Sequence, residues 1–340
     1  MAAGAAATAV KLREQGRLDA IMGLGGSGGS TIVAAAMRAL PIGVPKLLVS
    51  TVAAGDTRPY VDTTDIMLLP SIVDISGINP ISERILRNAA GAVAGMARAQ
   101  APAELDSTAG GRTRLVAATM FGVTTPCVTH LREALDGFGY ETVVFHATGT
   151  GGRAMERLLR DGYLTGVIDV TTTELADELV GGVLSAGAER LEAAGSLGLP
   201  QVVSLGALDM VNFGPRETVP ERFADRQFYV HNPTVTLMRT TPEENAELGA
   251  IIARKLNAAR GPLAVFIPLR GVSAIDVEGH AFHDPVADAA LIAALRTNLA
   301  PHVEAHELDM NINDPAFAQA MAERFDDLYQ DWEAQEETDA

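Results

Sequence analysis

Cysteine is almost absent from this sequence, since Cys127 is the only one among 340 residues. A single cysteine excludes an intramolecular disulfide framework and is typical of a reducing compartment. The sequence also lacks an apolar run of the roughly 20 residues that a membrane-spanning helix needs. Its alanine-rich beginning has no basic region before it, which argues against a signal peptide. We therefore expect a cytoplasmic protein that makes no contact with a membrane.

Positive charge is scarce as well. The chain has 26 Lys and Arg against 43 Asp and Glu, so its net charge is −17. This balance argues against binding to the phosphate backbone of nucleic acid or to an anionic membrane surface. It does not argue against one bound nucleotide, because local backbone amides and a metal ion suffice for that. The acidic segment 331–340 is expected to be a solvated tail.

Short apolar, β-branched runs alternate with segments of helical composition. The predicted strands are 18–24, 46–52, 65–70, 113–120, 141–147, 165–170, 200–205, 263–269 and 302–308. The predicted helices are 2–15, 30–39, 79–98, 126–137, 151–160, 173–180, 187–197, 242–258, 285–298 and 315–330. Such alternation predicts an α/β protein with mainly parallel sheets that are covered by helices on both faces.

The chain is long enough for two domains of this kind. Segment 99–112 is rich in Ala, Pro, Ser and Gly and has no periodicity, so we interpret it as a linker. We predict two doubly wound domains, at 1–105 and 112–330. The first has only three predicted strands, and its glycine-rich loop follows the first of them. Because such a loop normally follows a central strand, the first domain is predicted to be incomplete at its N-terminus.

Five of the seven residues 23–29 are glycine, between a predicted strand and a predicted helix. Gly23, Gly25 and Gly28 fit the dinucleotide pattern G-x-G-x-x-G, but the next strand ends in Ser50 and Thr51 where an acidic residue would bind a ribose. The phosphate-loop pattern nearly fits too, except that Gly29 takes the place of its lysine. NAD is therefore disfavoured, and the loop lacks the cation of a phosphate loop.

What remains is a set of backbone amides at the positive end of a helix, where glycines leave room for an anion. Phosphate is the usual anion there. The predicted phosphate-binding residues are Gly25, Gly26, Ser27, Gly28, Gly29, Ser30, Thr31 and Thr51. The alternative is a tight strand–helix crossing that needs glycine only for packing.

A similar motif recurs in the second half, where "GTGG" at 149–152 also follows a strand and opens a helix. It predicts a second anion site, facing a cleft between the domains, which a small acidic metabolite would occupy. The predicted binding residues are Gly149, Thr150, Gly151, Gly152 and Arg153. Arginine grips carboxylate or phosphate with two hydrogen bonds. His146, at the strand exit, is a candidate catalytic residue or else a hydrogen-bonded core histidine.

Carboxylates follow two other predicted strands. Asp56 and Asp65 lie in the polar segment 50–65 and are candidate magnesium ligands, since Mg²⁺ prefers oxygen. Asp169 and Glu174 flank a strand-to-helix turn and are candidate catalytic acids or bases. The alternative for each pair is the capping of a turn or helix. Cys127 lies near a helix start, where the dipole would lower its pKa, although a structural cysteine is the simpler reading.

Several long blocks resemble one family: "GLGGSGGST", "ALPIGVPKLLVSTVAAGDTRPYVDTTDI", "VDISGINPISERILRNAAGAVAGMA", "ATMFGVTTPCVTHLREAL", "FHATGTGGRAMERL", "VIDVTTTELADELVGGV", "GALDMVNFG" and "HNPTVTLMRTTPEEN". Together they look like the family of the tomato mosaic virus resistance protein, over about residues 5–325. The resemblance implies two α/β domains, ATP with Mg²⁺ in the first part of the chain, and a homodimer. It also implies that relatives carry a further strand–helix–strand–helix segment ahead of the region that corresponds to residue 1.

The sequence names no reaction. The first hypothesis is a protein that binds ATP and Mg²⁺ through the loop at 23–31. An alternative is an enzyme that acts on a small carboxylate or phosphorylated metabolite between the domains. A further alternative is a regulatory protein that uses nucleotide for assembly only.

Overall fold

The computed structural model describes residues 1–99 and 114–339, which form two compact units within Met1–Gly111 and Arg112–Ala340. Each unit is described by itself. The predicted linker at 99–112 and the predicted domain limits at 105 and 112 lie outside the described residues, apart from Ala99. None of the helices in the described residues has the length and apolarity needed to cross a membrane.

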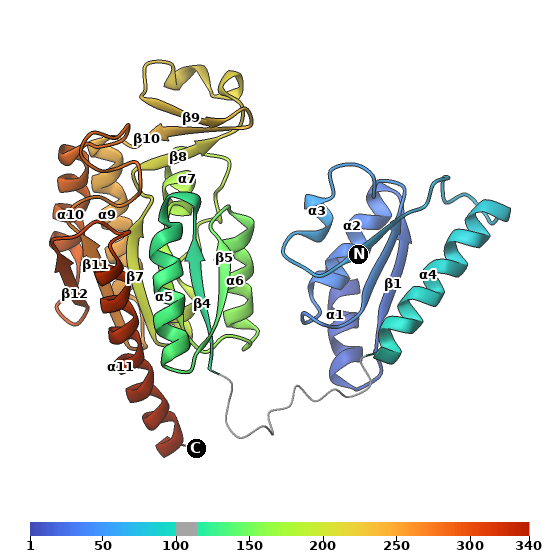
Figure 1. Ribbon diagram of the computed structural model, residues 1–340. Coiled ribbons are helices and arrows are strands. Elements are labelled where there is room, and N and C mark those ends of the chain that lie inside the picture. The colour runs from blue at the N-terminus through green and yellow to red at the C-terminus, as the bar shows by residue number, and fades with distance from the viewer. Residues whose placement is uncertain (100–113, 340) are drawn as a thin grey trace. The chain divides into compact units, whose positions relative to one another are not determined.

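The N-terminal unit is a three-stranded parallel sheet with helices on both faces (Figure 1). Its elements are α1 (Ala2–Glu14), β1 (Ile21–Gly25), α2 (Ser27–Arg38), β2 (Lys46–Ser50), the short α3 (Arg58–Val61), β3 (Met67–Pro70) and α4 (Pro80–Ala99). The strand order is β1-β2-β3, so β1 pairs on one side only among the described residues. The short α3 is the one element of this unit that the sequence pattern did not predict.

Side-chain packing shows that α2 and α4 lie on opposite faces of this sheet. A Cβ atom on Gly23 would meet the side chain of Val33 in α2, so the face of Gly23 is the α2 face. Leu47 and Val49 point to the other face, where they pack against Ala89 and its neighbours in α4. The loops that leave the carboxyl ends of β1 and β3 therefore run to opposite sides of the sheet. Ligands of open parallel sheets bind between such diverging loops.

The C-terminal unit contains a six-stranded parallel sheet with the order β12-β11-β7-β6-β4-β5. The strands are β4 (Leu115–Met120), β5 (Glu141–His146), β6 (Val167–Thr171), β7 (Gln201–Gly206), β11 (Leu263–Pro268) and β12 (Glu304–Leu308). The helices are α5 (Thr125–Gly137), α6 (Thr150–Arg160), α7 (Glu174–Val180), α8 (Ala193–Leu197), α9 (Pro242–Asn257), α10 (Pro285–Asn298) and α11 (Pro315–Asp339), with a 3-10 turn at Gly122–Thr124 before α5.

Two hydrophobic cores cover the two faces of this sheet. On one face, Ile168 and Phe266 pack with residues of α5 and α11, including Phe325. On the other, Val203 and Val265 pack with residues of α7, α9 and α10. Helices on both faces of parallel sheets confirm the predicted fold class, an α/β protein with doubly wound domains. The loops after β4 and β6 also run to opposite faces, which makes the gap between these strands the switch point of the larger sheet.

One part of the fold is absent from the sequence-based prediction. Along the chain, three strands follow β7 and precede α9: β8 (Met210–Phe213), β9 (Phe228–Asn232) and β10 (Val235–Arg239). They form a small antiparallel sheet with the order β8-β10-β9, which projects from the C-terminal unit (Figure 1). The 3-10 turns Arg216–Thr218 and Glu221–Phe223 connect β8 to β9. All nine predicted strands are present, whereas the predicted helix at 187–197 is helical only as α8.

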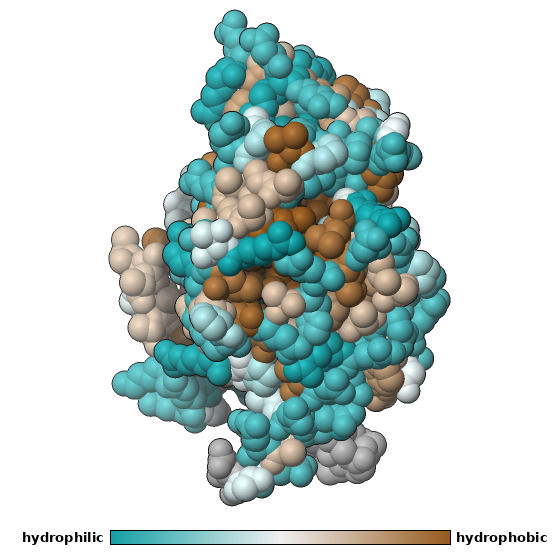
Figure 2. Space-filling model, turned by 90° about the vertical axis from the view of Figure 1, so that its left-hand side faces the viewer, coloured by the Kyte–Doolittle hydropathy of each residue, from teal (hydrophilic) through white to brown (hydrophobic). Residues whose placement is uncertain are grey.

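The outer edge strands of the larger sheet are β12 and β5. Along β12, partly buried residues alternate with exposed ones, as in a strand with one covered face. Figure 2 shows that hydrophobic residues gather in the middle of the side that carries α10 and β12, with hydrophilic residues around them. This side of the C-terminal unit is therefore mixed rather than uniformly polar.

Candidate functional site

The glycine-rich loop of the N-terminal unit makes a sharp turn from β1 into α2. Gly26 is the N-cap of α2 and has an extended backbone. A Cβ atom on Gly25 would lie 2.6 Å from the amide nitrogen of Ser30, so only glycine fits there. Gly23 and Gly25 thus meet the packing needs of this crossing, which was the alternative explanation for the glycines.

Packing does not explain the other glycines of this loop. A Cβ on Gly28 would meet nothing within 4 Å, and one on Gly26 would meet only the hydroxyl of Thr51, at 3.4 Å. Ser27, Gly28 and Gly29 are exposed. Their amides find no acceptor among the described residues, and no side chain caps α2. The loop therefore presents a row of open donors at the positive end of a helix, which suits an anion.

The hydroxyl groups of this loop divide into two kinds. Ser30 is buried, and its Oγ lies 2.6 Å from Oγ of Ser50. Thr31 donates its hydroxyl hydrogen to the carbonyl of Ser27 at 2.9 Å. Both predicted donors are thus satisfied within the chain. Ser27 and Thr51 remain exposed at the same edge, where the amide of Thr51 donates to the carbonyl of Gly25 at 3.2 Å.

The two predicted magnesium ligands do not come together. Asp65 lies before β3 and binds Lys46 Nζ at 2.7 Å, at the amino end of β2. A strand of five residues spans roughly 16 Å, so Asp65 lies at the opposite edge of the sheet from the glycine loop. Its assignment to a metal at the phosphates is wrong for this geometric reason. Asp56 follows β2 and forms an exposed ion pair with Arg58, and no group of three metal-ligating side chains occurs among the described residues.

The second glycine loop, between β5 and α6, already holds an anion from its own chain. Oε1 of Glu174 accepts hydrogen bonds from the amides of Gly149 at 2.6 Å and Gly152 at 3.1 Å. A Cβ on Gly152 would lie 2.0 Å from Glu174, and one on Gly151 would lie 1.9 Å from the carbonyl oxygen of His146. These glycines are explained by close packing, so the prediction of an open anion site at Gly149–Gly152 is corrected.

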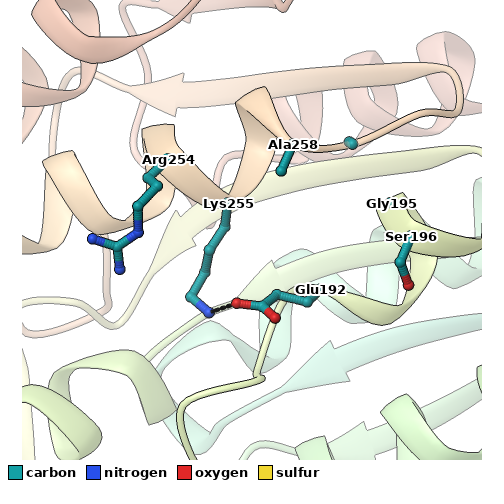
Figure 3. Close-up of a pocket in the computed structure, with 7 residues that line it drawn as sticks. Glu192, Gly195, Ser196, Arg254, Lys255 and Ala258 are labelled. Atoms are coloured by element: carbon teal, nitrogen blue, oxygen red, sulfur yellow. Dashed lines mark hydrogen bonds and ion pairs between the residues drawn. The ribbon is translucent and has the colours of Figure 1, made fainter.

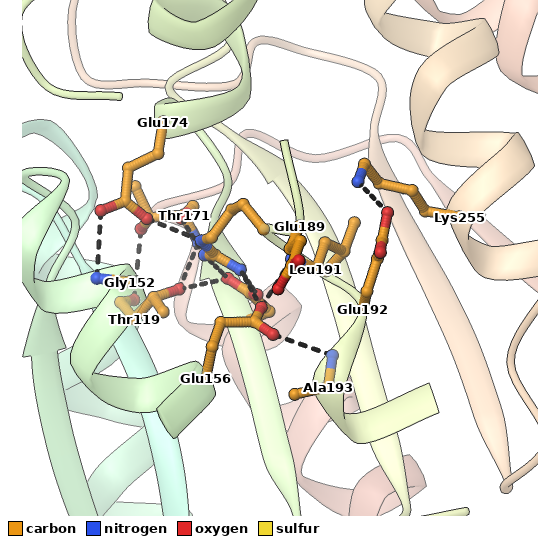
Figure 4. Close-up of polar contacts among 12 residues, drawn as sticks. Thr119, Gly152, Glu156, Thr171, Glu174, Glu189, Leu191, Glu192, Ala193 and Lys255 are labelled. Atoms are coloured by element: carbon orange, nitrogen blue, oxygen red, sulfur yellow. Dashed lines mark hydrogen bonds and ion pairs between the residues drawn. The ribbon is translucent and has the colours of Figure 1, made fainter. Parts of the chain in front are cut away.

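Polar contacts surround Glu174, with Thr119, Gly152 and Glu156 close by (Figure 4). Arg190 is the shared cation of these contacts, because it pairs with Glu156, Asp169 and Glu174. Its Nε donates to Glu174 at 2.6 Å, and its Nη1 and Nη2 both donate to Asp169. Asp169 also accepts from the Thr119 hydroxyl at 2.7 Å, across the switch point between β4 and β6. Burial opposes the charge of Arg190, but Asp169, Glu174 and Glu156 outweigh it, so the pKa of Arg190 is raised.

The same network removes the predicted catalytic carboxylates from solvent. Asp169 and Glu174 are 1% and 0% exposed, so neither is open to a substrate in this structure. His146 is exposed at the end of β5, with its ring 5.5 Å from that of Phe121. Arg153, in the first turn of α6, is exposed. The structure thus joins Asp169 and Glu174 through Arg190, a residue that the sequence did not single out.

A second buried polar cluster also escaped sequence analysis. Arg239 at the end of β10 binds Asp288 of α10 at 2.7 Å and lies 3.5 Å from Asp276, while Ser273 donates to Asp209 at 2.8 Å. One oxygen of Asp209 and one of Asp276 have no hydrogen-bond partner among the described residues. Burial, and then the charge of Asp276, raises the pKa of Asp209 to about 8 and that of Asp288 to about 7. Burial thus favours the uncharged form of Asp209 and of Asp288 in a cluster that has three carboxyl groups and one guanidinium group.

A cleft of about 330 Å³ lies between α8 and α9, lined by Glu192, Gly195, Ser196, Arg254, Lys255, Ala258 and Ala259 (Figure 3). Two cationic side chains, Arg254 and Lys255, line this cleft. Lys255 is buried and forms an ion pair with Glu192, which neutralises its charge. The cleft opens near the start of β7 and β11, at the amino edge of the sheet. It is therefore remote from the switch point, where ligands of such sheets usually bind.

Cys127 is buried in α5, and burial raises the pKa of its thiol to about 12. Desolvation thus outweighs any effect of the helix dipole. Cys127 is a structural residue, as the simpler reading of the sequence had it.

Comparison with known proteins gives the chain its family. The N-terminal domain model of the uncharacterised protein family UPF0261 matches residues 1–102, and the C-terminal domain model matches residues 113–329. The chain belongs to the UPF0261 family. A UPF0261 protein of Clostridium tetani (strain Massachusetts / E88) is 55% identical over 325 residues, which cover 95% of this chain and 79% of that protein.

A tomato protein is also similar. The ToMV resistance protein Tm-1(GCR237) of Solanum lycopersicum is 48% identical over 316 residues, which cover 92% of this chain and 42% of the tomato protein. A UPF0261 protein of Rhizobium meliloti (strain 1021) is 52% identical over 310 residues, or 91% of this chain and 76% of that protein. The family resemblance read from the sequence is thereby confirmed.

Proposed function

We propose that the N-terminal unit binds the phosphate groups of a nucleotide, ATP in the first instance, at the carboxyl edge of its sheet. The observation that carries the proposal is the row of exposed amides of Ser27, Gly28 and Gly29, for which the described residues provide no acceptor. Amides that end a helix in this way bind phosphate through both hydrogen bonds and the helix dipole.

The loop itself supplies no cationic side chain for phosphate, since residues 23–31 include no Lys or Arg. The amides would contact the oxygens of one phosphate group, and the hydroxyls of Ser27 and Thr51 lie at the same edge as additional donors. The remaining negative charge of ATP needs a counter-ion, which Mg²⁺ supplies when it binds phosphate oxygens. Water and phosphate oxygens would complete its coordination, with Asp56 the nearest predicted carboxylate on this edge.

Calorimetric titration of ATP–Mg²⁺ into the full chain tests this proposal. Gly26→Val places a branched side chain beside the open amides, at a residue whose φ is −82° and which is therefore outside the left-handed region that favours glycine. We expect it to weaken ATP binding by at least about tenfold, or about 1.4 kcal/mol. The fold should persist, because the only close neighbour of the new Cβ is the hydroxyl of Thr51.

Gly91→Val is the matched control. Gly91 lies in α4, roughly 16 Å along the helix axis from Pro80, and a Cβ there meets nothing within 4 Å. The control should bind ATP as the parent chain does. Equal affinities of the parent chain and the Gly26→Val variant would place the nucleotide elsewhere. The predicted homodimer is part of the same proposal, and light scattering on the titrated samples measures it.

A further inference from the structure

Four isoleucines surround the connection between β3 and α4 in the N-terminal unit. Ile72, Ile75, Ile78 and Ile81 are 77%, 37%, 78% and 54% exposed. Single exposed apolar side chains are common on proteins, but a contiguous group on one short loop marks an interaction surface. We call residues 71–81 the isoleucine loop.

The isoleucine loop is strained as well as apolar. Ile72 has a φ of 64°, in the left-handed region that β-branched residues rarely adopt. Such conformations cost free energy and occur preferentially at ligand clamps and other functional sites. The base of the loop is fixed, because the amide of Ser71 donates to the carbonyl of Ser50 at 3.1 Å and the hydroxyl of Ser71 donates to the carbonyl of Val73 at 2.7 Å.

The loop lies beside the proposed phosphate site. Gly25 is paired with Ser50, and Ser50 with Pro70, so the three strands end at the same level. Two strand spacings, roughly 10 Å, separate the end of β1 from the end of β3. This is within the length of a nucleotide. Because the loops after β1 and β3 run to opposite faces of the sheet, they border the carboxyl edge from two sides.

The surface between the loops suits an uncharged ring better than a second phosphate. Asp74 is the only charged residue in segment 71–79. A small hollow beneath the loop has a mixed lining in which apolar side chains outnumber polar ones: Val49, Val73, Ile75, Ile85 and Leu86, with Ser71, Asp74, Gly77 and Ser82. The hollow holds only about 20 Å³, less than a ring requires, so a ring would lie over the isoleucines rather than inside the hollow.

We infer that the isoleucine loop binds the heterocyclic base of the nucleotide whose phosphates lie on Ser27–Gly29. Ile72 and Ile78, the two most exposed members, supply the apolar contact, and the glycine loop supplies the polar one. This inference rests on the proposed function and adds to it that two different loops bind two different parts of the nucleotide. The phosphate contacts are common to all polyphosphates, whereas the isoleucine contacts select ligands that carry a base.

Two ligands separate these contributions in the full chain: ATP–Mg²⁺, and tripolyphosphate–Mg²⁺, which lacks both ribose and base. The test variant is the double substitution Ile72→Ser and Ile78→Ser, which alters exposed side chains only. The double substitution Val183→Ser and Val286→Ser is the matched control, since these valines are 64% and 68% exposed in the C-terminal unit. Calorimetry gives each affinity, and light scattering gives the oligomeric state.

The isoleucine variant should weaken ATP binding about tenfold and leave tripolyphosphate binding unchanged, whereas Gly26→Val should weaken both. Unchanged ATP affinity in the isoleucine variant, with Gly26→Val still defective, would overturn this inference and leave the proposed function standing. So would a change of oligomeric state without a change in ATP affinity, which would make the loop a contact between copies of the chain. If the parent chain binds neither ligand, the proposed function itself is wrong.

Discussion

The two glycine loops have almost the same sequence, "GSGG" and "GTGG", and the same place between a parallel strand and a helix. They differ in whether the described residues supply an acceptor for their amides. In the C-terminal unit the amides of Gly149 and Gly152 bind Glu174, a carboxylate 22 to 25 residues further along the chain. In the N-terminal unit the amides of Ser27, Gly28 and Gly29 have no acceptor among the described residues. An anion site that the chain fills itself is structural, whereas one that it leaves open is available to a ligand.

The residues that surround the two loops also differ, in their charge. Glu174 is held by Arg190, which also binds Asp169, so the filled loop belongs to a buried network of charges. The open loop has no charged residue within 23–31, and its buried polar contact is the neutral pair Ser30–Ser50. Substitutions in the C-terminal network should therefore change stability, whereas substitutions in the N-terminal loop should change binding.

The largest effect is expected from Arg190→Ala. This change leaves Asp169, Glu174 and Glu156 buried without their common cation, and breaking such a network by removing one partner costs about 3–5 kcal/mol. Fluorescence of Trp332, the only tryptophan, reports on unfolding of the C-terminal unit because it lies in α11. Urea denaturation should show the loss. The exposed Arg254→Ala serves as control, and equal midpoints for the two variants would mean that the network contributes little.

Alkaline pH should weaken the C-terminal unit by a smaller amount. Burial raises the pKa of Asp177, next to Glu174 on α7, to about 7 and that of Asp209 to about 8. Groups with raised folded-state pKa values contribute stability that is fully present below their unfolded values and lost as the pH rises through the folded ones. The unfolding free energy should fall by on the order of 2 kcal/mol between pH 6 and 9.

Substitution of both residues tests the cause of that pH dependence. Asp177→Asn with Asp209→Asn should remove the part of the slope that these two residues contribute, again as followed by Trp332 fluorescence, and should leave the part that comes from Asp288, whose pKa is also raised to about 7. A profile that keeps its full slope in the double variant would assign the titration to other groups.

A third change would turn the filled loop into an open one. Glu174→Ala removes the internal anion and exposes the amides of Gly149 and Gly152, together with Nε of Arg190. Formate, a small carboxylate, should then bind in its place and restore on the order of 1 kcal/mol of stability at high concentration. The parent chain should show no such gain in thermal melts with formate against chloride. Equal responses of parent and variant would indicate a general salt effect rather than a vacated anion site.

Much of the fold could be predicted from the sequence, because the parallel strands are short β-branched runs and several helices begin at clear signals such as Pro242 and Pro315. The antiparallel sheet β8-β10-β9 was missed. Its strands interrupt the strand–helix alternation on which the prediction rested, and β9 is largely exposed, with no apolar periodicity. Arg190 was missed because it lies in a turn where a helix was expected, next to Leu191 with a φ of 74°.

The site was predictable only in part. The pattern "GSGG" correctly indicates a helix N-terminus with bare amides, but sequence cannot show whether another part of the chain already binds them. Glu174 was singled out as a catalytic residue, and its burial against Gly149 and Arg190 became visible only when β4, β5 and β6 were placed side by side. The prediction that Asp65 is a magnesium ligand failed for a similar reason. A residue that precedes a strand lies at the opposite edge of the sheet from a residue that follows a strand.

The central claim is that a polyphosphate binds the open loop and not the filled one. A two-dimensional amide spectrum of the full chain, labelled with ¹⁵N at glycine only, observes both loops in one titration with ATP–Mg²⁺. The account predicts that the resonances of Gly28 and Gly29 shift progressively while those of Gly149 and Gly152 stay in place. Shifts confined to Gly149 and Gly152, or no shift at either loop, would contradict it.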